Sequence, residues 1–332
     1  MRIAFMGEAL IDFTSQDGGD AALRFAGHVG GSPLNAAIAG ARLGQPTGLL
    51  TQLSTDLFGE RILGYLQRNG VDTRFVPRSA APSTLAFVER TPQTNRYAFY
   101  AAGSADATWS PQPLPELPPG CAFLHFGSIA MLQEPAASRI LDMVRASSGR
   151  RVVVLDPNVR PSLIGDMARY RRQVAQWAGL SDLVKLSDED AELLAPGRAI
   201  DALARDYLMA GARAVAVTRG AAGATLWRTG HAPMDAAAPN VPVADTIGAG
   251  DTFTAALSVA LLAQGVDRPA QIDTLDDTAW HTAMRFAATA AALNCTREGA
   301  DPPTLAAVQE LLGRGADTGA VPHASIPGRC TP

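Results

Sequence analysis

The chain has 332 residues, of which 47% are apolar and 18% are charged, and its formal net charge is −4. This length and composition suit a globular protein with a sizeable core. The acidic balance argues against nucleic acid as the main partner, because phosphate backbones require clustered cations. The sequence shows no apolar run that could span a bilayer, no signal-peptide pattern, and only three widely spaced cysteines. We therefore expect a cytoplasmic protein without a membrane partner.

Short apolar segments alternate with helix-like segments along the chain. The predicted strands are 3–6, 49–53, 123–126, 152–155, 183–186 and 214–218. The helices predicted between them include 36–43, 61–69 and 138–147. This alternation predicts the α/β class, with a mainly parallel central sheet and helices on both faces. In such sheets, ligands bind beyond the carboxyl ends of the strands.

Two segments, about 12–29 and 83–103, interrupt this alternation with short strands and no helix. Gln93-Thr94-Asn95 suits the tip of a hairpin in the second segment. The two segments are either surface hairpins or a small antiparallel sheet that forms a lid. We favour a lid, because one apolar face of such a sheet needs a substrate or a second subunit to cover it. We expect residues 1–312 to form one domain and residues 313–332 to fray.

The first candidate site is the segment 30–35, Gly-Gly-Ser-Pro-Leu-Asn, which predicts the start of a helix. Ser32 suits the N-cap and Pro33 the first helical position, and capping alone explains both residues. The two glycines before them would let a ligand approach the main chain closely. Asn35 offers an amide that can donate to and accept from hydroxyl groups.

Polar side chains also follow two of the predicted strands. Asp12 comes after the first strand, where its carboxylate could bind a sugar diol or could be an ordinary turn aspartate. Asp156, Asn158 and Arg160 follow the strand 152–155, where α/β enzymes place functional groups. A loop that is capped and holds an internal ion pair would have the same sequence pattern.

The next two strands end in further candidates. Ser187 and Asp190 match a capping box, and the acidic side chain could also order a hydrated magnesium ion. The run 218–223, Thr-Arg-Gly-Ala-Ala-Gly, suits either a bound nucleotide or a tight hairpin. No GxxxxGK[ST] sequence occurs, so the chain is not a P-loop protein.

The run 245–251, Asp-Thr-Ile-Gly-Ala-Gly-Asp, is the most informative motif. It predicts a glycine turn that opens a helix, with the N–H groups of Gly248, Ala249 and Gly250 available to an anionic oxygen. Asp251 could take a proton from a hydroxyl group while these amides hold the charge of a transferring phosphoryl group. Alternatively, Asp251 could do no more than stabilise the helix dipole.

In this order, these stretches resemble the ribokinase-like (PfkB) family of sugar kinases over roughly residues 1–312. The segment 30–35 is similar to its N-terminal sugar signature, and the run 245–251 to its C-terminal catalytic signature. The segments 156–160, 185–187 and 295–300 look most like bacterial fructokinases, and next most like 2-keto-3-deoxygluconate kinases.

The resemblance implies roles for individual residues. It implies that Asp251 is the base that deprotonates the acceptor hydroxyl. It also implies that the amides of Gly248, Ala249 and Gly250 form the anion hole. The sugar would be held by Asp12, Gly31, Asn35 and Arg160. ATP would be held by Lys185, Ser187, Thr218, Gly220, Gly223 and Ala288. Asp190 would reach Mg2+ through water, and a monovalent cation such as K+ would bind Asp245 and the carbonyl groups of Ile247, Cys295 and Gly299.

The sequence departs from the family pattern at two places. Ser187 and Asp190 stand where many relatives have Asn-x-x-Glu, and no arginine follows Tyr100, which disfavours a carboxylate substrate. We predict an ATP- and Mg2+-dependent kinase for a primary hydroxyl, that of D-fructose at O6, which forms a homodimer through the lid. The alternatives are a 2-keto-3-deoxygluconate kinase, a ribokinase or nucleoside kinase, and a non-catalytic sugar or nucleotide sensor.

Overall fold

The computed structural model describes residues 1–16, 23–90 and 95–317. A sheet of eight strands runs through it in the order β14-β13-β12-β11-β10-β9-β1-β4. Six neighbouring strands are parallel: β4 (Thr47–Leu50), β1 (Ile3–Met6), β9 (Phe123–Gly127), β10 (Val152–Asp156), β11 (Leu183–Ser187) and β12 (Ala214–Thr218). The last two, β13 (Ala224–Arg228) and β14 (Met234–Ala236), continue the sheet antiparallel.

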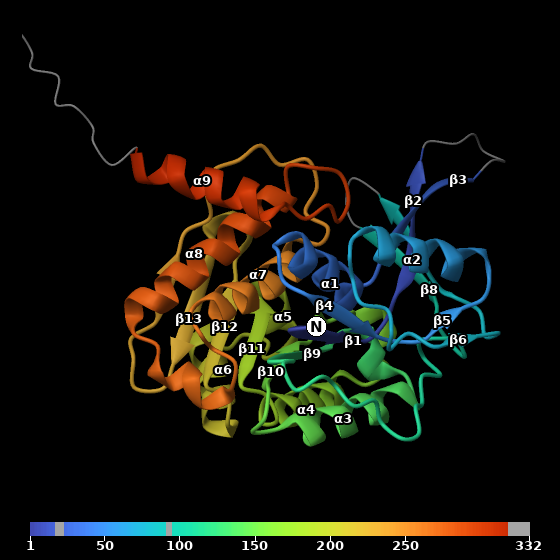
Figure 1. Ribbon diagram of the computed structural model, residues 1–332, viewed down its shortest axis with the longest axis horizontal. Coiled ribbons are helices and arrows are strands. Elements are labelled where there is room, and N and C mark those ends of the chain that lie inside the picture. Colours follow the sequence, from blue (N-terminus) through green and yellow to red (C-terminus); the bar gives the residue numbers. More distant parts are fainter. Residues whose placement is uncertain (17–22, 91–94, 318–332) are drawn as a thin grey trace, which may run out of the picture.

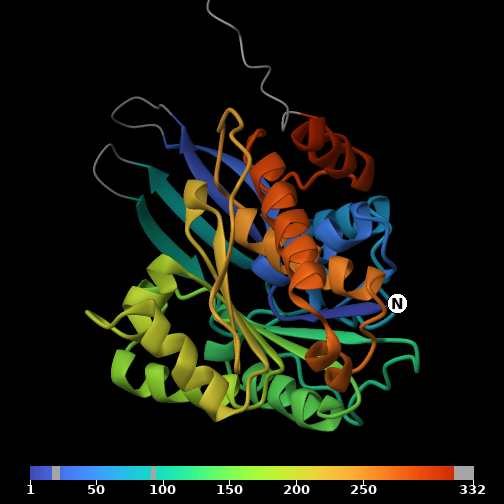
Figure 2. The same ribbon diagram turned by 90° about the vertical axis from the view of Figure 1, so that its left-hand side faces the viewer.

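Helices cover both faces of this sheet (Figures 1 and 2). Alternate strand residues point to opposite faces, so Phe5 packs in one hydrophobic core and Met6 in the other. The Phe5 side carries α1 (Ser32–Arg42), α7 (Ala249–Ala263) and α8 (Asp277–Asn294). The Met6 side carries α3 (Ala136–Ser147), α4 (Met167–Ala178), α5 (Asp188–Leu194) and α6 (Ile200–Ala210). The predicted parallel sheet with two helical layers is confirmed.

The remaining elements are two further helices that pack on the Phe5 side and several short segments. They are β5 (Leu53–Ser54), β6 (Arg78–Ser79), α2 (Leu57–Arg68), α9 (Leu305–Asp317) and the 3-10 helices η1 (Ile129–Leu132), η2 (Pro161–Leu163), η3 (Gly220–Ala222) and η4 (Pro269–Thr274). The predicted strand 49–53 is divided between β4 and β5, and the helix predicted at 36–43 already begins at Ser32. Residues 313–317 are helical, which corrects the expected boundary of the tail at residue 313. The rest of that tail, 318–332, lies outside the described residues.

The two interrupting segments form a second sheet of four strands in the order β3-β2-β7-β8. Its strands are β2 (Leu10–Gln16), β3 (Arg24–Gly30), β7 (Thr84–Arg90) and β8 (Asn95–Tyr100). Each hairpin is antiparallel, but β2 and β7 pair in parallel, so the sheet is mixed rather than antiparallel throughout. The first strands of the two hairpins, β2 and β7, are neighbours and run in the same direction. Of the predicted hairpin tip, Asn95 begins β8, and Gln93 and Thr94 lie outside the described residues.

No helix in the described part of the chain combines the length and the apolar character that crossing a membrane requires.

Candidate active site

The turn before α7 has the geometry of an anion site. Gly248 is the N-cap of α7 and has a φ of 77°, a left-handed conformation that glycine adopts readily. The first main-chain bond of the helix runs from the N–H of Thr252 to the carbonyl of Gly248 (2.9 Å). Among the described residues, the N–H groups of Gly248 and Gly250 have no main-chain partner, whereas that of Ala249 donates to the carbonyl of Thr246 (3.2 Å). The predicted hole therefore has two open amides rather than three.

The carboxylate of Asp251 is buried and held by helix α1. The Ser32 hydroxyl donates to its Oδ1 (2.6 Å), and the Asn35 amide donates to its Oδ2 (2.9 Å). The prediction that Ser32 caps α1 is wrong: Gly31 is the N-cap, with no side-chain cap, and the hydroxyl reaches Asp251 instead. Asn35, predicted for the sugar, lies one hydrogen bond from the predicted base. The two signature segments thus meet at a single carboxylate.

Beside this carboxylate lies a buried ion pair. The Lys185 ammonium is 3.0 Å from Oδ2 of Asp156, and the Thr254 hydroxyl donates to the same oxygen (2.8 Å). Oδ1 of Asp156 is buried and has no hydrogen-bond partner among the described residues. Burial alone would lower the pKa of Lys185, but Asp156, Asp190 and Asp251 outweigh it and raise that pKa. Lys185 therefore carries its positive charge inside the site.

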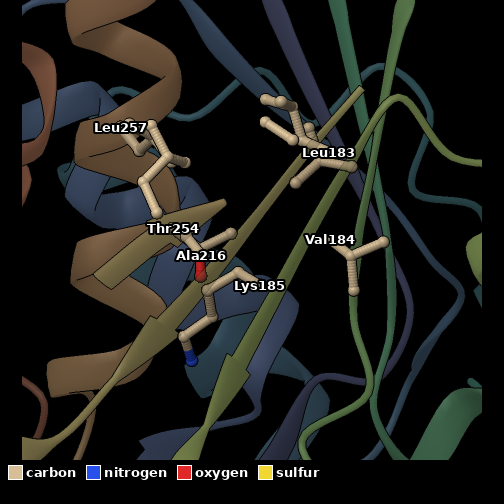
Figure 3. A pocket seen from close by; sticks show the side chains of 9 residues that line it. Leu183, Val184, Lys185, Ala216, Thr254 and Leu257 are labelled. Atoms are coloured by element: carbon tan, nitrogen blue, oxygen red, sulfur yellow. The ribbon is translucent and has the colours of Figure 1, made fainter. Parts of the chain in front are cut away.

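Two small cavities border these groups. One, of about 20 Å³, is lined by Ser32, Asp156, Asp251 and Thr254 among others, and has room for about one water molecule. The second, of about 10 Å³, lies between α7 and the sheet. Figure 3 shows Thr254 and Leu257 pointing from α7 toward the strands, with the side chain of Lys185 extending past Thr254. Neither cavity has room for a sugar.

Asp12 lies in strand β2 and interacts electrostatically with Arg160 and Asp251. Burial raises the pKa of Asp12 to about 6, against the opposing effect of Arg160, and Asp251 adds to the rise. These electrostatic interactions show that Asp12 lies near Arg160 and Asp251. The Arg160 guanidinium donates to the carbonyl of Val159 (3.1 Å). A Cβ atom at Gly30 would lie 2.2 Å from Oδ2 of Asp12, so glycine at that position leaves space for the carboxylate.

Ser187 and Asp190 form the predicted capping box. The N–H of Asp190 donates to the Ser187 hydroxyl (2.9 Å), and the N–H of Ser187 donates to Oδ2 of Asp190 (3.0 Å). Oδ1 of Asp190 accepts from the N–H of Val159 (2.8 Å), which links the loops after β10 and β11. Each carboxylate oxygen retains a second lone pair, which is able to accept from a water molecule of a hydrated Mg2+ ion.

The residues predicted for the nucleotide are divided between a strand end and a core helix. Thr218 pairs with Ser187 at the carboxyl ends of β12 and β11. A Cβ atom at Gly223 would lie 2.1 Å from the Ala236 carbonyl oxygen, so the tight β12–β13 turn alone requires that glycine. Gly220, with a φ of 51°, begins η3 in the same turn. Ala288 lies in α8 and is buried in the core.

The residues predicted for a monovalent cation lie together beside the start of α7. The Asp245 carboxylate accepts from the N–H groups of Ile247 (3.2 Å) and Gly299 (3.1 Å). The Cys295 carbonyl accepts from the N–H of Asp245 (3.2 Å), and the Ile247 carbonyl from the Asn294 side chain (2.7 Å). Within residues 1–16, 23–90 and 95–317, no cluster of three His, Cys, Asp or Glu side chains could hold a metal ion. This donor set, mostly carbonyl oxygen, suits an alkali cation better than zinc.

Sequence reasoning missed Glu8, Ser32 and Thr254 as parts of this site. Glu8 is 2% exposed, and burial raises its pKa to about 7. Its position after the first buried strand is the signal that could have identified it, because carboxyl ends of parallel strands carry functional groups. Thr254 follows Asp251 by one helical turn, so the two share a helix face. The sequence gives no such signal for Ser32, because a serine at this position is typical of an ordinary helix N-cap.

The chain is similar to carbohydrate kinases in sequence and in structure. Residues 1–307 match the model of the pfkB family carbohydrate kinases. A fructokinase of Rhizobium leguminosarum bv. trifolii is 36% identical over 273 residues, which are 82% of this chain and 83% of the relative. The probable fructokinase-3 of Arabidopsis thaliana is 31% identical over 309 residues, 90% of this chain and 87% of the relative.

Solved structures agree with this similarity. The fructokinase of Xylella fastidiosa with bound ATP has a TM-score of 0.84 at 27% identity, covering 95% of this chain and 98% of that one. The fructokinase of Vibrio cholerae O395 with bound fructose, ADP and calcium ion has a TM-score of 0.81 at 25% identity, covering 94% and 98%.

Proposed function

Because this chain belongs to the pfkB family of carbohydrate kinases, we propose that it is a fructokinase that transfers the γ-phosphate of ATP to O6 of D-fructose. The observation that carries the proposal is the carboxylate of Asp251 in the first turn of α7, beside the open amides of Gly248 and Gly250. A sugar or nucleotide sensor needs no base at that position. The fructokinase names of the similar proteins support the choice of sugar.

In the proposed reaction, Asp251 takes the proton from the O6 hydroxyl as that oxygen forms a bond to the γ-phosphorus and the bond to ADP breaks. The amides of Gly248 and Gly250 hold the charge on the transferring group. Lys185 adds to this field, because its Nζ is 2.7 Å from where a Cβ atom of Gly250 would be. We therefore propose that Lys185 acts from behind the turn on the phosphate end of ATP.

We propose that the sugar lies between the lid and the start of α1. Asp12 and Arg160 would bind its hydroxyl groups, Asn35 would orient it beside the base, and Gly31 would let it approach the main chain. Ala101 follows Tyr100 where an arginine would suit a carboxylate substrate. This supports a neutral sugar over 2-keto-3-deoxygluconate.

ATP is proposed to lie along the ends of β11 and β12, at Ser187, Thr218, Gly220 and Gly223, with Ala288 in the wall near the adenine. Mg2+ would enter with ATP, ordered by Asp190 through water, and would neutralise phosphate charge when bound. The oxygen atoms around Asp245, Ile247, Cys295 and Gly299 would hold K+.

The described cysteines, Cys121 and Cys295, are free thiols, which supports the proposed cytoplasmic location.

We also propose a homodimer that forms through the lid. The lid's aromatic face consists of Phe13, Phe25, Phe87 and Tyr100, which contact one another at ring distances of 4.9–5.7 Å. Asp12 points the opposite way, because neighbouring residues of a strand face opposite sides. Phe58 of α2 covers part of this aromatic face (5.7 Å from Phe13), but Tyr100 remains 65% exposed. A second copy of the chain would bury it.

The test is ADP release with Mg-ATP in the presence of fructose, 2-keto-3-deoxygluconate, ribose, glucose or adenosine. We expect fructose to be turned over selectively, and Asp251→Asn to lower kcat at least about 10²-fold with fructose binding retained. Turnover of the ketodeoxy acid instead would keep the mechanism and change the substrate. Bound nucleotide without any acceptor-dependent turnover would favour the sensor, and an active Asp251→Asn variant would refute the base.

A further inference from the structure

Glu8 contacts the helix that holds the proposed base. It lies between β1 of the central sheet and β2 of the lid. Its Oε1 accepts from the N–H of Ser32 (3.2 Å), and its Oε2 from the N–H of Ala130 in η1 (3.2 Å). The hydroxyl of the same Ser32 donates to Oδ1 of Asp251 (2.6 Å). Two hydrogen bonds through one residue therefore join Glu8 to Asp251.

We propose that Glu8 is a positioning residue for phosphoryl transfer, which holds the first turn of α1 so that Ser32 fixes the carboxylate of Asp251. This inference rests on the proposed function, because it takes Asp251 as the base. Glu8 does not contact Asp251, and it acts only through Ser32.

The start of α1 needs a partner from outside the helix. The first N–H groups of a helix have no intrahelical acceptor, and the N-cap residue Gly31 has no side chain to offer one. Glu8 supplies that acceptor to Ser32. Gly31 has a φ of 111°, and a Cβ atom there would lie 2.8 Å from the Glu8 carbonyl oxygen, so the two segments are in close contact. The position of Ser32 therefore depends on Glu8.

The hydroxyl of Ser32 then selects one orientation of the base. Asn35 holds the other carboxylate oxygen of Asp251 (2.9 Å), so the plane of the carboxylate is set from two positions on α1. Displacing a reacting group by about 1 Å costs up to about 10²-fold in rate. If the hydrogen bond from Ser32 to Asp251 is lost, that from Asn35 remains. We therefore expect a smaller decrease in rate than removal of the base would cause.

Glutamine is an informative replacement for Glu8 because it keeps the size and removes one of the two acceptors. In Glu8→Gln, one of the amides of Ser32 and Ala130 would face an NH2 group instead of an oxygen. Ser32→Ala removes the hydroxyl and leaves the main-chain contact to Glu8. Ser32→Ala thus breaks the bond to Asp251, and Glu8→Gln breaks either the bond to Ser32 or the bond to Ala130 that holds the Glu8 side chain in place.

The experiment is a double-mutant cycle on kcat for the proposed sugar, normalised to the number of ATP-binding sites. We expect Glu8→Gln and Ser32→Ala each to lower kcat roughly 3- to 10-fold, with the KM for ATP unchanged. Because both act on one path, the double variant should be no slower than the slower single variant. Effects that multiply, or wild-type kcat in either single variant, would overturn the proposal. If Glu8→Gln does not fold, the kcat of Ser32→Ala alone tests the proposal.

Asp182→Asn is the matched control for a purely structural role. Asp182 is a partly buried carboxylate that accepts from the N–H of Val153 (2.9 Å), and it precedes β11 at the end of the sheet opposite the site. We expect this variant to lose stability and to keep its kcat. Asp251→Asn distinguishes failure of the proposed function from failure of the positioning role. If Asp251→Asn still turns over, Asp251 is not the base and the premise of this inference is lost. If Asp251→Asn is inactive while the Glu8 and Ser32 variants are fully active, only the positioning role of Glu8 is refuted.

Discussion

Lys185 and Asp156 form an ion pair of 3.0 Å across strands β11 and β10, with only 6% and 11% of their side chains exposed. A buried pair of this kind adds little net stability, but removal of one partner leaves an uncompensated buried charge. The same ammonium lies behind the turn of Gly250. The pair therefore links the stability of the central sheet to the electrostatics of the site.

The first prediction concerns this pair. We expect Lys185→Met to lower the free energy of unfolding by about 3–5 kcal/mol, because Asp156 then remains buried without its cation. Urea denaturation followed by circular dichroism measures the loss. The control is Arg198→Met, which breaks the exposed pair of Arg198 and Asp206 (2.8 Å) and should cost less than about 1 kcal/mol. Equal losses in the two variants would contradict the role of burial.

The second prediction concerns binding of the sugar. Burial raises the pKa of Asp12 to about 6 despite Arg160, so this carboxyl becomes neutral below about pH 6 and accepts hydroxyl protons less well. We expect the KM for fructose to rise roughly 10-fold for each pH unit below that value. Steady-state kinetics from pH 5 to pH 8 test this. Asp12→Asn should show a high KM that does not depend on pH in this window; an unchanged slope in that variant would assign the titration to another group.

The third prediction concerns stability and pH. Burial raises the pKa of Glu8 from 4.5 to about 7, so the folded protein holds a proton that the unfolded chain releases between these values. The contribution of Glu8 is present below about pH 4.5 and is lost as the pH rises through 7, up to about 3 kcal/mol. We expect Glu8→Gln to show a smaller decrease in unfolding free energy between pH 5 and pH 8 than the wild type.

Other buried carboxyls preserve part of this pH dependence in the variant. Burial also raises the pKa values of Asp12 and Asp106, and their contributions have the same sign. Urea denaturation at the two pH values gives the difference between variant and wild type. An identical decrease in both proteins would show that Glu8 titrates alike in the folded and unfolded states.

The fourth prediction concerns assembly. We expect Tyr100→Asp to convert the proposed dimer into a monomer, because a charge would be placed in the interface on the aromatic face of the lid. Sedimentation equilibrium measures the association. Met209→Asp is the control: Met209 is 78% exposed on α6, away from the lid, and this variant should stay dimeric. A monomeric wild type would refute the dimer, and a dimeric Tyr100→Asp variant would place the interface elsewhere.

Much of the fold could be predicted because its patterns are local. Apolar runs such as that of β10 identify buried strands wherever they occur, and the glycine turn before Asp251 marks the start of α7. The lid showed the limit of this reasoning. Its two hairpins could be recognised from their own residues, but the parallel pairing of β2 with β7 joins segments separated by α1 and α2.

The site divides in the same way. The sequence by itself determined which residues have suitable chemistry: the proposed base Asp251, the glycines before it, and the polar groups at strand ends, since these follow from residue type and spacing. Only the tertiary structure decided which groups contact one another. Ser32 and Asp251 are 219 positions apart, and no local rule states that a serine hydroxyl will leave its own helix N-terminus for a distant carboxylate. Such contacts depend on how helices pack across the sheet, which the spacing of residues along the chain does not record.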